Sequence, residues 1–524
     1  MSNRSVRVCV PVCAKSFAEM EVACARAREV ADIIELRLDC LEELRLDGLD
    51  ELPLDSLGNN SELIPVFEPL RRTQADQFII TFRPSEQGGH RVLSRAEREA
   101  FWKGDRSPSR TALADIESEL VVDESRSLNS TFEWSRVIVS HHDFHGVPED
   151  LENIYERLAA TPAHVVKIAV QAHDITDCLR IFNLLERARN EQRNLIAIAM
   201  GNAGVATRIL GPARGAFLTY GSLEDASATA PGQITARQLR SLYRIDEIDD
   251  DTMICGLIGM PVMHSVSPHM HNAAFADEGV NGVYLPLEVR DVETFIKRMA
   301  HPATRELDWN LRGLSVTAPH KTSVMEWLDW VEPDAQEIGA VNTIVAEGNG
   351  LHGYNTDAHG LLEPLRKRVG SFNGLSVAVI GAGGAARAAV WALKKERAKL
   401  RLFARSRPKV EELAREFDLG FEPVQSAQFR NYDVVINTTP LGSGELVGWT
   451  VAVADQLAGA KLVYDLIYNP SETQFLKEAR EAGCETLGGL EMLVAQARLQ
   501  FELWTGKTPS PDVMYAAAAA ALRR

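Results

Sequence analysis

A lysine and a histidine in the first half of the chain lie where they could carry out covalent chemistry. Lys167 falls within the apolar run Val165–Val170, and a buried lysine is costly unless its pKa falls or it is paired. A side chain that reaches to the rim of the fold is the structural alternative. We favour a nucleophile that forms a Schiff base with a ketone, because His142, at the end of another apolar run, could carry protons beside it.

A glycine-rich turn in the second half lies between an apolar strand-like run and a helical pattern. Its residues are Gly381, Ala382, Gly383, Gly384 and Ala385. This arrangement is typical of a dinucleotide site, where the turn admits a pyrophosphate to a helix N-terminus. The next strand is followed by Arg405, Ser406 and Arg407, with no acidic residue among them. Two guanidinium groups suit a 2′-phosphate, so NADP (NADPH) is favoured over NAD.

A second group of polar residues precedes the glycine-rich turn. Ser265 and Ser267 could both offer hydroxyl groups to one carboxylate, although helix capping explains one of them nearly as well. Three further segments place polar residues at the ends of short apolar strands: Ser315–Lys321, Gly339–Thr343 and Gly353–Asp357. Alone, each of these segments is weak support for a binding site.

Eight short β-rich runs in the first half would position Lys167 and His142. They span residues 6–13, 33–39, 78–83, 113–117, 136–141, 165–169, 195–200 and 216–220. Helical patterns separate most of them, which indicates parallel strands with helical crossovers. Eight such units in about 245 residues predict a (β/α)8 TIM barrel, whose active site lies at the C-terminal ends of the strands. Glu35, Arg37 and Arg83 also occupy such ends.

Composition and charge narrow the class of protein. The chain has 524 residues, 45% of them hydrophobic, and a formal net charge of −17, so nucleic acid and anionic lipid are poor partners. The longest apolar runs fall short of a membrane helix, and the N-terminus leaves no room for a signal peptide, so we expect a cytoplasmic enzyme. Seven cysteines include no Cys-x-x-Cys pair. Reduced thiols and no metal are expected.

The first half resembles type I 3-dehydroquinate dehydratase in five motifs: Glu35–Asp39, Thr81–Arg83 with Gly88-Gly89, Ser140–Phe144, Val166–Ala169 and Ala230–Gln233. The resemblance implies an imine between Lys167 and the substrate ketone, with His142 as the proton carrier. It also implies that the substrate is bound by Glu35, Arg37, Arg83, Arg208, Thr229 and Gln233. The family often has Glu directly before the Gly-Gly pair, where this chain has Gln87.

Residues 253–524 resemble shikimate dehydrogenase. The resemblance rests on Gly259–Pro268, Ser315–Lys321, Gly339–Thr343, Gly353–Asp357, Asn437–Gly442, Tyr464-Asp465, Tyr468–Pro470 and Gly488–Leu493. It implies that Lys321 and Asp357 form a catalytic pair. The implied substrate contacts are Ser265, Ser267, Thr317, Asn342 and Gln496, and Thr439 and Gly489 would lie along NADP. The family usually has Asn where this chain has Ala404.

The two resemblances together predict an α/β chain with five segments. They are a barrel at 1–245, a linker at 246–252, a substrate-binding domain at 253–360, an NADP-binding Rossmann domain at 361–490, and helices at 491–524 that return to the substrate-binding domain. The expected small-molecule partners are 3-dehydroquinate, 3-dehydroshikimate and shikimate, and an oligomer is possible. A quinate-preferring dehydrogenase and a non-catalytic metabolite sensor with the same folds are the alternatives.

Overall fold

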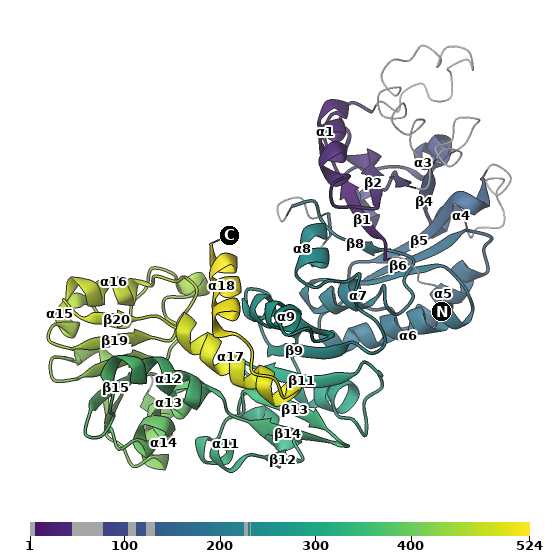
Figure 1. The fold of residues 1–524 in the computed structure, drawn as a ribbon. Helices are drawn as coiled ribbons and strands as arrows, with labels where there is room; N and C mark the ends of the chain where they lie inside the picture. Colours follow the sequence, from purple (N-terminus) through teal and green to yellow (C-terminus); the bar gives the residue numbers. More distant parts are fainter. Residues whose placement is uncertain are drawn as a thin grey trace. The chain divides into compact units, whose positions relative to one another are not determined.

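The structure is a computed structural model of the chain (Figure 1). It describes residues 6–44, 77–102, 112–121, 132–224, 229–230, 232–405 and 407–523. Contacts divide the chain into two units, Met1–Asp251 with Leu287–Val289 and Thr252–Pro286 with Arg290–Arg524. Among the described residues, no helix is long and apolar enough to cross a membrane.

Eight parallel strands form one sheet in the first unit, in the order β7-β6-β5-β4-β3-β2-β1-β8. They are β1 (Val8–Val12), β2 (Ile33–Arg37), β3 (Phe78–Thr81), β4 (Leu113–Glu117), β5 (Val137–Asp143), β6 (Val165–Gln171), β7 (Leu195–Met200) and β8 (Thr219–Tyr220). The backbone N–H of Phe217, before β8, donates to the carbonyl oxygen of Leu195 in β7 (2.8 Å). The two edges of the sheet therefore meet, and the TIM-barrel prediction is confirmed.

Helices cross over between the strands of this unit. They are α1 (Phe17–Ala27), α3 (Arg95–Trp102), α4 (Ser118–Val121), α5 (Leu151–Ala159), α6 (Cys178–Asn190), α7 (Val205–Leu210) and α8 (Ala236–Ser241). Each of the eight strands, or the residues just before it, contributes to one apolar cluster inside the barrel, which includes Ile33, Ile138 and Ile196. This layer fills the interior, so the polar side chains gather at the C-terminal ends of the strands.

The second unit begins with a mixed six-stranded sheet in the order β10-β9-β11-β13-β14-β12. Its strands are β9 (Met253–Gly259), β10 (Gly282–Glu288), β11 (Leu311–Val316), β12 (Trp330–Val331), β13 (Thr343–Glu347) and β14 (Gly350–Tyr354). The helices around it are α9 (Ser267–Asp277), α10 (Val292–Phe295), α11 (Pro333–Ile338), α17 (Leu490–Thr505) and α18 (Pro511–Leu522). Phe501, Trp504 and Met514 pack into one core with Cys255 and Phe275. Helices α17 and α18, yellow in Figure 1, therefore pack against this mixed sheet.

A second six-stranded sheet carries the glycine-rich turn. All of its strand pairs are parallel, in the order β17-β16-β15-β18-β19-β20. The strands are β15 (Ser376–Ile380), β16 (Lys399–Ala404), β17 (Phe421–Pro423), β18 (Val434–Asn437), β19 (Leu462–Asp465) and β20 (Glu485–Leu487), with helices α12 (Asp357–Val369), α13 (Gly384–Lys395), α14 (Arg407–Glu416), α15 (Ala454–Leu457) and α16 (Gln474–Glu481). The Rossmann fold predicted from the sequence is confirmed.

The expectation that all cysteines are reduced is wrong for two of the seven. Cys13 and Cys40 form a disulfide across a sequence separation of 27 residues, with their Cα atoms 5.4 Å apart. The parallel pairing of Val12 with Leu36 brings the ends of β1 and β2 together, and this proximity cannot be seen from the cysteine spacing. A ring nitrogen of His90 lies within 4.8 Å of both sulfur atoms. The other five cysteines are free and buried.

The disulfide is expected to stabilise the barrel by restricting its unfolded chain. For a loop of this length, the chain-entropy relation gives about 3–4 kcal/mol. Cys13→Ala should lower the free energy of unfolding of the first unit by that amount, measured by urea denaturation. A reductant should lower the free energy of unfolding of the wild-type protein to that of the variant. It should leave the free energy of unfolding of the variant unchanged. Equal stability of the oxidised wild-type protein and the variant would contradict this prediction.

Candidate active sites

A cavity at the C-terminal ends of the barrel strands brings together the predicted polar residues of the first half. Its lining includes Glu35, Arg37, Arg83, His142, Lys167, Arg208, Thr229 and Gln233. These side chains come from three strands (β2, β5 and β6), from the residues just after β3, from α7 and from the segment between β8 and α8. Gln87, Phe144 and Tyr220 also line the cavity. The eight residues selected from the sequence therefore share one cavity.

Asp115 pairs with two cations of this cavity, and the sequence analysis missed it. Its Oδ2 atom lies 2.6 Å from Lys167 Nζ and 2.7 Å from Arg83 Nη2, and all three side chains are buried. Burial alone would raise the pKa of Asp115, but Arg83, Lys167 and His142 lower it well below its usual value. The available signal was a carboxylate inside an apolar strand, the same feature that identified Lys167.

His142 is held as a neutral imidazole. Burial, reinforced by the charges of Arg83 and Lys167, lowers the pKa of His142 well below its usual value. Arg83 Nη1 lies 2.9 Å from His142 Nε2 and can donate to it. Gln87, by contrast, has a buried Oε1 atom without a hydrogen-bond partner among the described residues. The imidazole is thus oriented by Arg83, and it can accept a proton at neutral pH.

The remaining cavity residues are fixed by local contacts. Arg37 donates to Asp39 (2.9 and 2.7 Å) and to the carbonyl oxygen of Gly88 (3.0 Å). Thr81 donates to Glu35 (2.5 Å). Burial lowers the pKa of Arg208 to about 10. In the segment after β8, the backbone N–H of Thr229 donates to the side-chain oxygen of Gln233 (2.8 Å). These contacts preorganise a cationic cavity suited to an anionic substrate.

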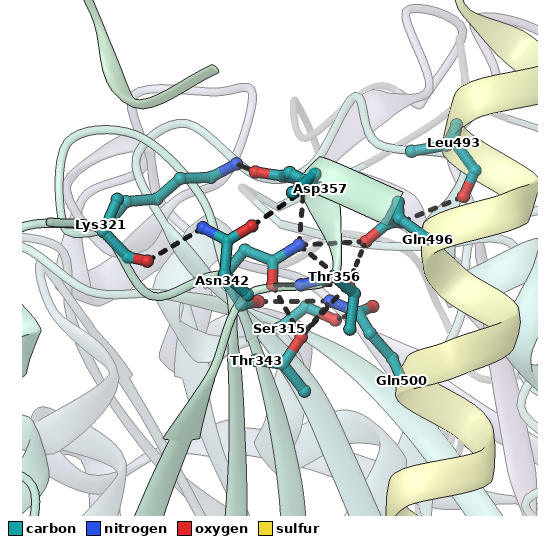
Figure 2. A network of polar contacts seen from close by, with 12 residues as sticks. Ser315, Lys321, Asn342, Thr343, Thr356, Asp357, Leu493, Gln496 and Gln500 are labelled. Atoms are coloured by element: carbon teal, nitrogen blue, oxygen red, sulfur yellow. Dashed lines mark hydrogen bonds and ion pairs between the residues drawn. The ribbon is translucent and has the colours of Figure 1, made fainter. Parts of the chain in front are cut away.

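In the second unit, Lys321 Nζ donates to Asp357 Oδ2 (Figure 2). Asp357 is the first residue of α12, and Asn342 Nδ2 donates to its other carboxylate oxygen (2.8 Å). The backbone N–H of Val341 donates to the carbonyl oxygen of Lys321 (2.7 Å). A lysine ammonium held by an oriented carboxylate is a suitable general acid. The structure brings these two residues together, as the sequence analysis expected.

Helix α17 completes this site with two glutamines. Gln496 Oε1 lies 3.3 Å from Asn342 Nδ2. One turn further along, Gln500 donates to the carbonyl oxygen of Asn342 (3.1 Å) and accepts from Ser315 (2.7 Å). Figure 2 shows both glutamines reaching from α17 toward the strands. Asn342 and Gln496 were expected from the family resemblance, and Ser315 belongs to a segment expected at the site. Gln500 was missed, because an amide on an apolar helix face suggests no chemistry without its partners.

The hydroxyl residues lie at strand and helix ends of the same unit. Ser265 Oγ accepts from the backbone N–H of Ser267, the first residue of α9 (3.2 Å), whereas the N-cap residue Val266 makes no side-chain capping hydrogen bond. Ser265 Oγ also donates to Ser267 Oγ (3.1 Å). Thr317 directly follows β11, and its methyl group would lie 2.4 Å from a Cβ at Gly259. Tyr284 is hydrogen-bonded to Ser267 and donates to Ser315 Oγ (2.7 Å), so a hydrogen-bonded path runs from Ser267 to the network of Asn342.

The glycine-rich turn fits a dinucleotide phosphate. Gly381 has φ +130°, and a Cβ there would lie 2.2 Å from Thr438 Oγ1, so a side chain is excluded. A Cβ at Gly383 would meet nothing within 4 Å. Gly383 is the N-cap of the 12-residue helix α13. An anion can therefore approach the free N–H groups at the N-terminus of this helix. Lys321 Cδ would lie 3.3 Å from a Cβ at Gly384, which places the turn beside the lysine.

The other predicted cofactor residues surround this turn. Arg405 is exposed directly after β16, Ser406 lies outside the described residues, and the side chain of Arg407 is likewise not described. The backbone N–H and the hydroxyl of Thr439 both donate to Asn437 (3.0 and 2.8 Å). A Cβ at Gly489 would lie 2.2 Å from the carbonyl oxygen of Leu466. Ala382 and Ala385 belong to the turn and to the first turn of α13.

A barrel with a lysine in its cavity, joined to a Rossmann unit with a lysine and aspartate pair, defines a lyase and an oxidoreductase in one chain. Three family models match: type I 3-dehydroquinase at residues 8–250, the shikimate dehydrogenase substrate binding domain at 257–344, and the shikimate 5′-dehydrogenase C-terminal domain at 489–519. The matched segments lie in both units and follow the order of the predicted domains.

Relatives of full length combine both parts. The chain is 33% identical to the chloroplastic bifunctional 3-dehydroquinate dehydratase/shikimate dehydrogenase of Arabidopsis thaliana, covering 97% of this chain and 83% of that protein. It is 29% identical to the shikimate biosynthesis protein AroDE of Chlamydia pneumoniae, covering 96% of each. A crystal structure of a shikimate dehydrogenase with NADP⁺ covers 53% of this chain and 98% of its own, with 36% identity and a TM-score of 0.50. The chain belongs to the family of bifunctional 3-dehydroquinate dehydratase/shikimate dehydrogenases.

Glu117 gives the barrel a pH-dependent stability. Burial, with a further contribution from Asp115, raises the pKa of Glu117 from 4.5 to about 7, against the opposing effects of Arg83 and Arg98. The folded state therefore binds this proton more tightly than the unfolded state. The resulting stabilisation is complete below pH 4.5 and is lost as the pH rises through 7.

Glu117→Gln should therefore gain stability relative to the wild-type barrel as the pH is raised from about 5 to about 8. Urea denaturation of the first unit at the two pH values measures the difference. Glu133→Gln, at an exposed carboxyl group, is the matched control. A difference between wild type and Glu117→Gln that does not change with pH would contradict the prediction.

Proposed function

We propose that the two units catalyse successive reactions of the shikimate pathway with the residues described above. The barrel dehydrates 3-dehydroquinate to 3-dehydroshikimate, and the second unit reduces that ketone to shikimate with NADPH. One observation carries the assignment: each unit holds a lysine beside a buried aspartate. In the barrel the lysine lies on β6 and lines the cavity, and in the second unit it lies next to the glycine-rich turn. A sensor without catalysis would have no need of either pair.

In the barrel, Lys167 adds to the substrate ketone, and the oxygen leaves as water to give an imine. Neutral His142 then removes a proton from the carbon next to the imine carbon, and the electrons are delocalised into an enamine. His142 returns the proton to the departing hydroxyl group, so a second molecule of water leaves. Hydrolysis of the imine releases the product. Arg37, Arg83 and Arg208 bind the anionic substrate.

In the second unit, Lys321 donates a proton to the substrate oxygen as the ketone is reduced. NADPH, when bound at the glycine-rich turn, supplies the hydride. Asp357 holds the ammonium group of Lys321, and Asn342 fixes the orientation of that carboxylate. Ser265, Ser267 and Thr317 bind the carboxylate of the substrate, and Gln496 binds a hydroxyl group. Arg405, at the end of β16, binds the 2′-phosphate of NADPH.

The finer division of the chain is part of the same proposal. A barrel at 1–245, a linker at 246–252, a substrate-binding domain at 253–360, a Rossmann domain at 361–490 and returning helices at 491–524 agree with three separate sheets and with the packing of α17 on the first sheet of the second unit. Cytoplasmic localisation stays a prediction from the sequence, because the plant relative is described as chloroplastic.

Single substitutions should separate the two activities. Lys167→Met should abolish dehydration and keep NADP-dependent oxidation of shikimate. Asp357→Asn should lower dehydrogenase turnover about 100-fold or more, because the proton donor loses its partner, and it should keep dehydration. Both activities are measured on the same preparation of each variant. The activity that a variant keeps is then the control for the activity that it loses. Loss of both activities in either variant, or faster turnover of quinate than of shikimate, would contradict the assignment.

Arg405 should determine the preference for NADPH over NADH. Removing a charge-assisted hydrogen bond to a phosphate is worth about 1.5–3 kcal/mol, or about 10-fold to 100-fold in affinity. Arg405→Ala should therefore raise KM for NADPH by that factor and leave KM for NADH unchanged. Arg401→Ala, on the same strand, is the matched control. An equal effect on both cofactors would show that Arg405 does not contact the 2′-phosphate.

A further inference from the structure

The nitrogen of Lys167 has a second buried partner that neither the mechanism above nor the family resemblance uses. Tyr220, on β8, places its hydroxyl oxygen 3.0 Å from Lys167 Nζ. Lys167 Nζ also lies 4.6 Å from the centre of the Tyr220 ring. Both side chains are 4% exposed, and both line the dehydratase cavity. The hydroxyl group is therefore part of the reacting centre.

Formation of the imine requires two proton transfers at this nitrogen. A lysine ammonium carries three protons, and the protonated imine carries one on the same nitrogen. The other two must reach the ketone oxygen, which leaves as water. A group that moves them must contact the nitrogen and must be able to donate as well as accept. Among the described residues, Lys167 Nζ makes hydrogen bonds to Asp115 and Tyr220.

Asp115 is poorly suited to this transfer. Three neighbouring groups, Arg83, Lys167 and His142, lower its pKa well below the usual value, so the carboxylate holds a proton weakly. His142 makes a contact with Arg83 (2.9 Å) and none with Lys167 within hydrogen-bond distance among the described contacts. Asp115 is better placed to hold the one proton that stays on the imine nitrogen.

Tyr220 meets both requirements. Burial, followed by the negative charge of Glu35, raises the pKa of Tyr220 well above its usual value, so the hydroxyl stays protonated. A neutral hydroxyl group can accept one proton while it gives up its own. The thiol of Cys9, which pairs with Tyr220 in the adjoining strand, is hydrogen-bonded to it. Two strands thus hold the hydroxyl in place.

We propose that the hydroxyl group of Tyr220 relays protons between Lys167 and the ketone oxygen when the imine forms and when it is hydrolysed. Tyr220 accepts a proton from the ammonium and passes its own proton to the ketone oxygen, and the lone pair freed on nitrogen bonds to the carbonyl carbon. A second relay gives the oxygen another proton, the carbon–oxygen bond breaks, and water leaves. Tyr220 ends as it began, and Lys167 has lost two protons to that water. This inference rests on the imine mechanism proposed above.

The test compares the rate of imine formation in variants that lose one buried hydroxyl group. Tyr220→Phe keeps the ring beside Lys167 and removes the hydroxyl. Tyr243→Phe removes a buried hydroxyl of the same unit away from the cavity lining. Each full-length protein is mixed with 3-dehydroquinate and quenched with borohydride over a time course. Labelling of Lys167 is measured by peptide mass, and dehydrogenase activity of the same chain standardises the amount of protein.

We expect Tyr220→Phe to label Lys167 to the wild-type extent but about 100-fold more slowly, at the lower end of the contribution of a positioned proton carrier. Tyr243→Phe should match the wild-type rate. A wild-type rate in Tyr220→Phe would overturn the relay and leave the imine mechanism intact. Absence of label at Lys167 in the wild-type protein would overturn the imine mechanism itself.

A second measurement needs no substitution. The relay moves protons in the step that forms the imine, so labelling of the wild-type protein should be slower in deuterium oxide than in water. An equal rate in the two solvents would overturn the relay, even if a Tyr220 variant failed to fold. The thermal unfolding of Tyr220→Phe and Tyr243→Phe should be alike, which separates the loss of a proton path from a loss of stability.

Discussion

Asp115 controls the charge balance of the dehydratase cavity. Its carboxylate contacts both Lys167 and Arg83 at less than 3 Å, in the buried interior of the barrel. Two cations this close would repel each other strongly in a medium of low dielectric constant, and removal of a buried carboxylate leaves its partners uncompensated. Burial, together with the same two cations, holds the pKa of His142 well below its usual value. The nucleophile Lys167 and the anion-binding Arg83 therefore depend on one negative charge that does not take part in the reaction.

In the dehydrogenase site, amide groups orient the carboxylate that holds the lysine. Asp357 contacts a single cation, Lys321, and its other oxygen accepts from Asn342. Asn342 is in turn bonded to Thr356 (2.9 Å) and lies near Gln496. This network orients the carboxylate with neutral groups, and the carboxylate in turn positions the ammonium group of Lys321 for the substrate oxygen. A chain with a net charge of −17 can bind an anionic substrate in the barrel because Arg37, Arg83, Lys167 and Arg208 line one cavity.

Most of the fold could be predicted from the sequence, because most barrel strands contain a buried apolar run, such as Val137–Val139 in β5 and Leu195–Met200 in β7. The site residues at the strand ends followed from the rule that such ends converge. Asp115 and Tyr220 were missed, since their value depends on the register that turns them toward Lys167. A tyrosine in an apolar run has no distinctive chemistry of its own. The pairing of Cys13 with Cys40 was missed for the same reason, because parallel strands bring together residues that are distant in sequence.

The position of α17 has a consequence for synthesis of the protein. Gln496 and Gln500 reach the dehydrogenase network from a helix that follows the Rossmann sheet in the chain, whereas the other members come from residues 315–357. The cavity of the barrel draws on residues before 234. A ribosome therefore completes the parts of the first enzyme well before those of the second. A nascent chain can therefore contain all parts of the dehydratase while the dehydrogenase site still lacks helix α17.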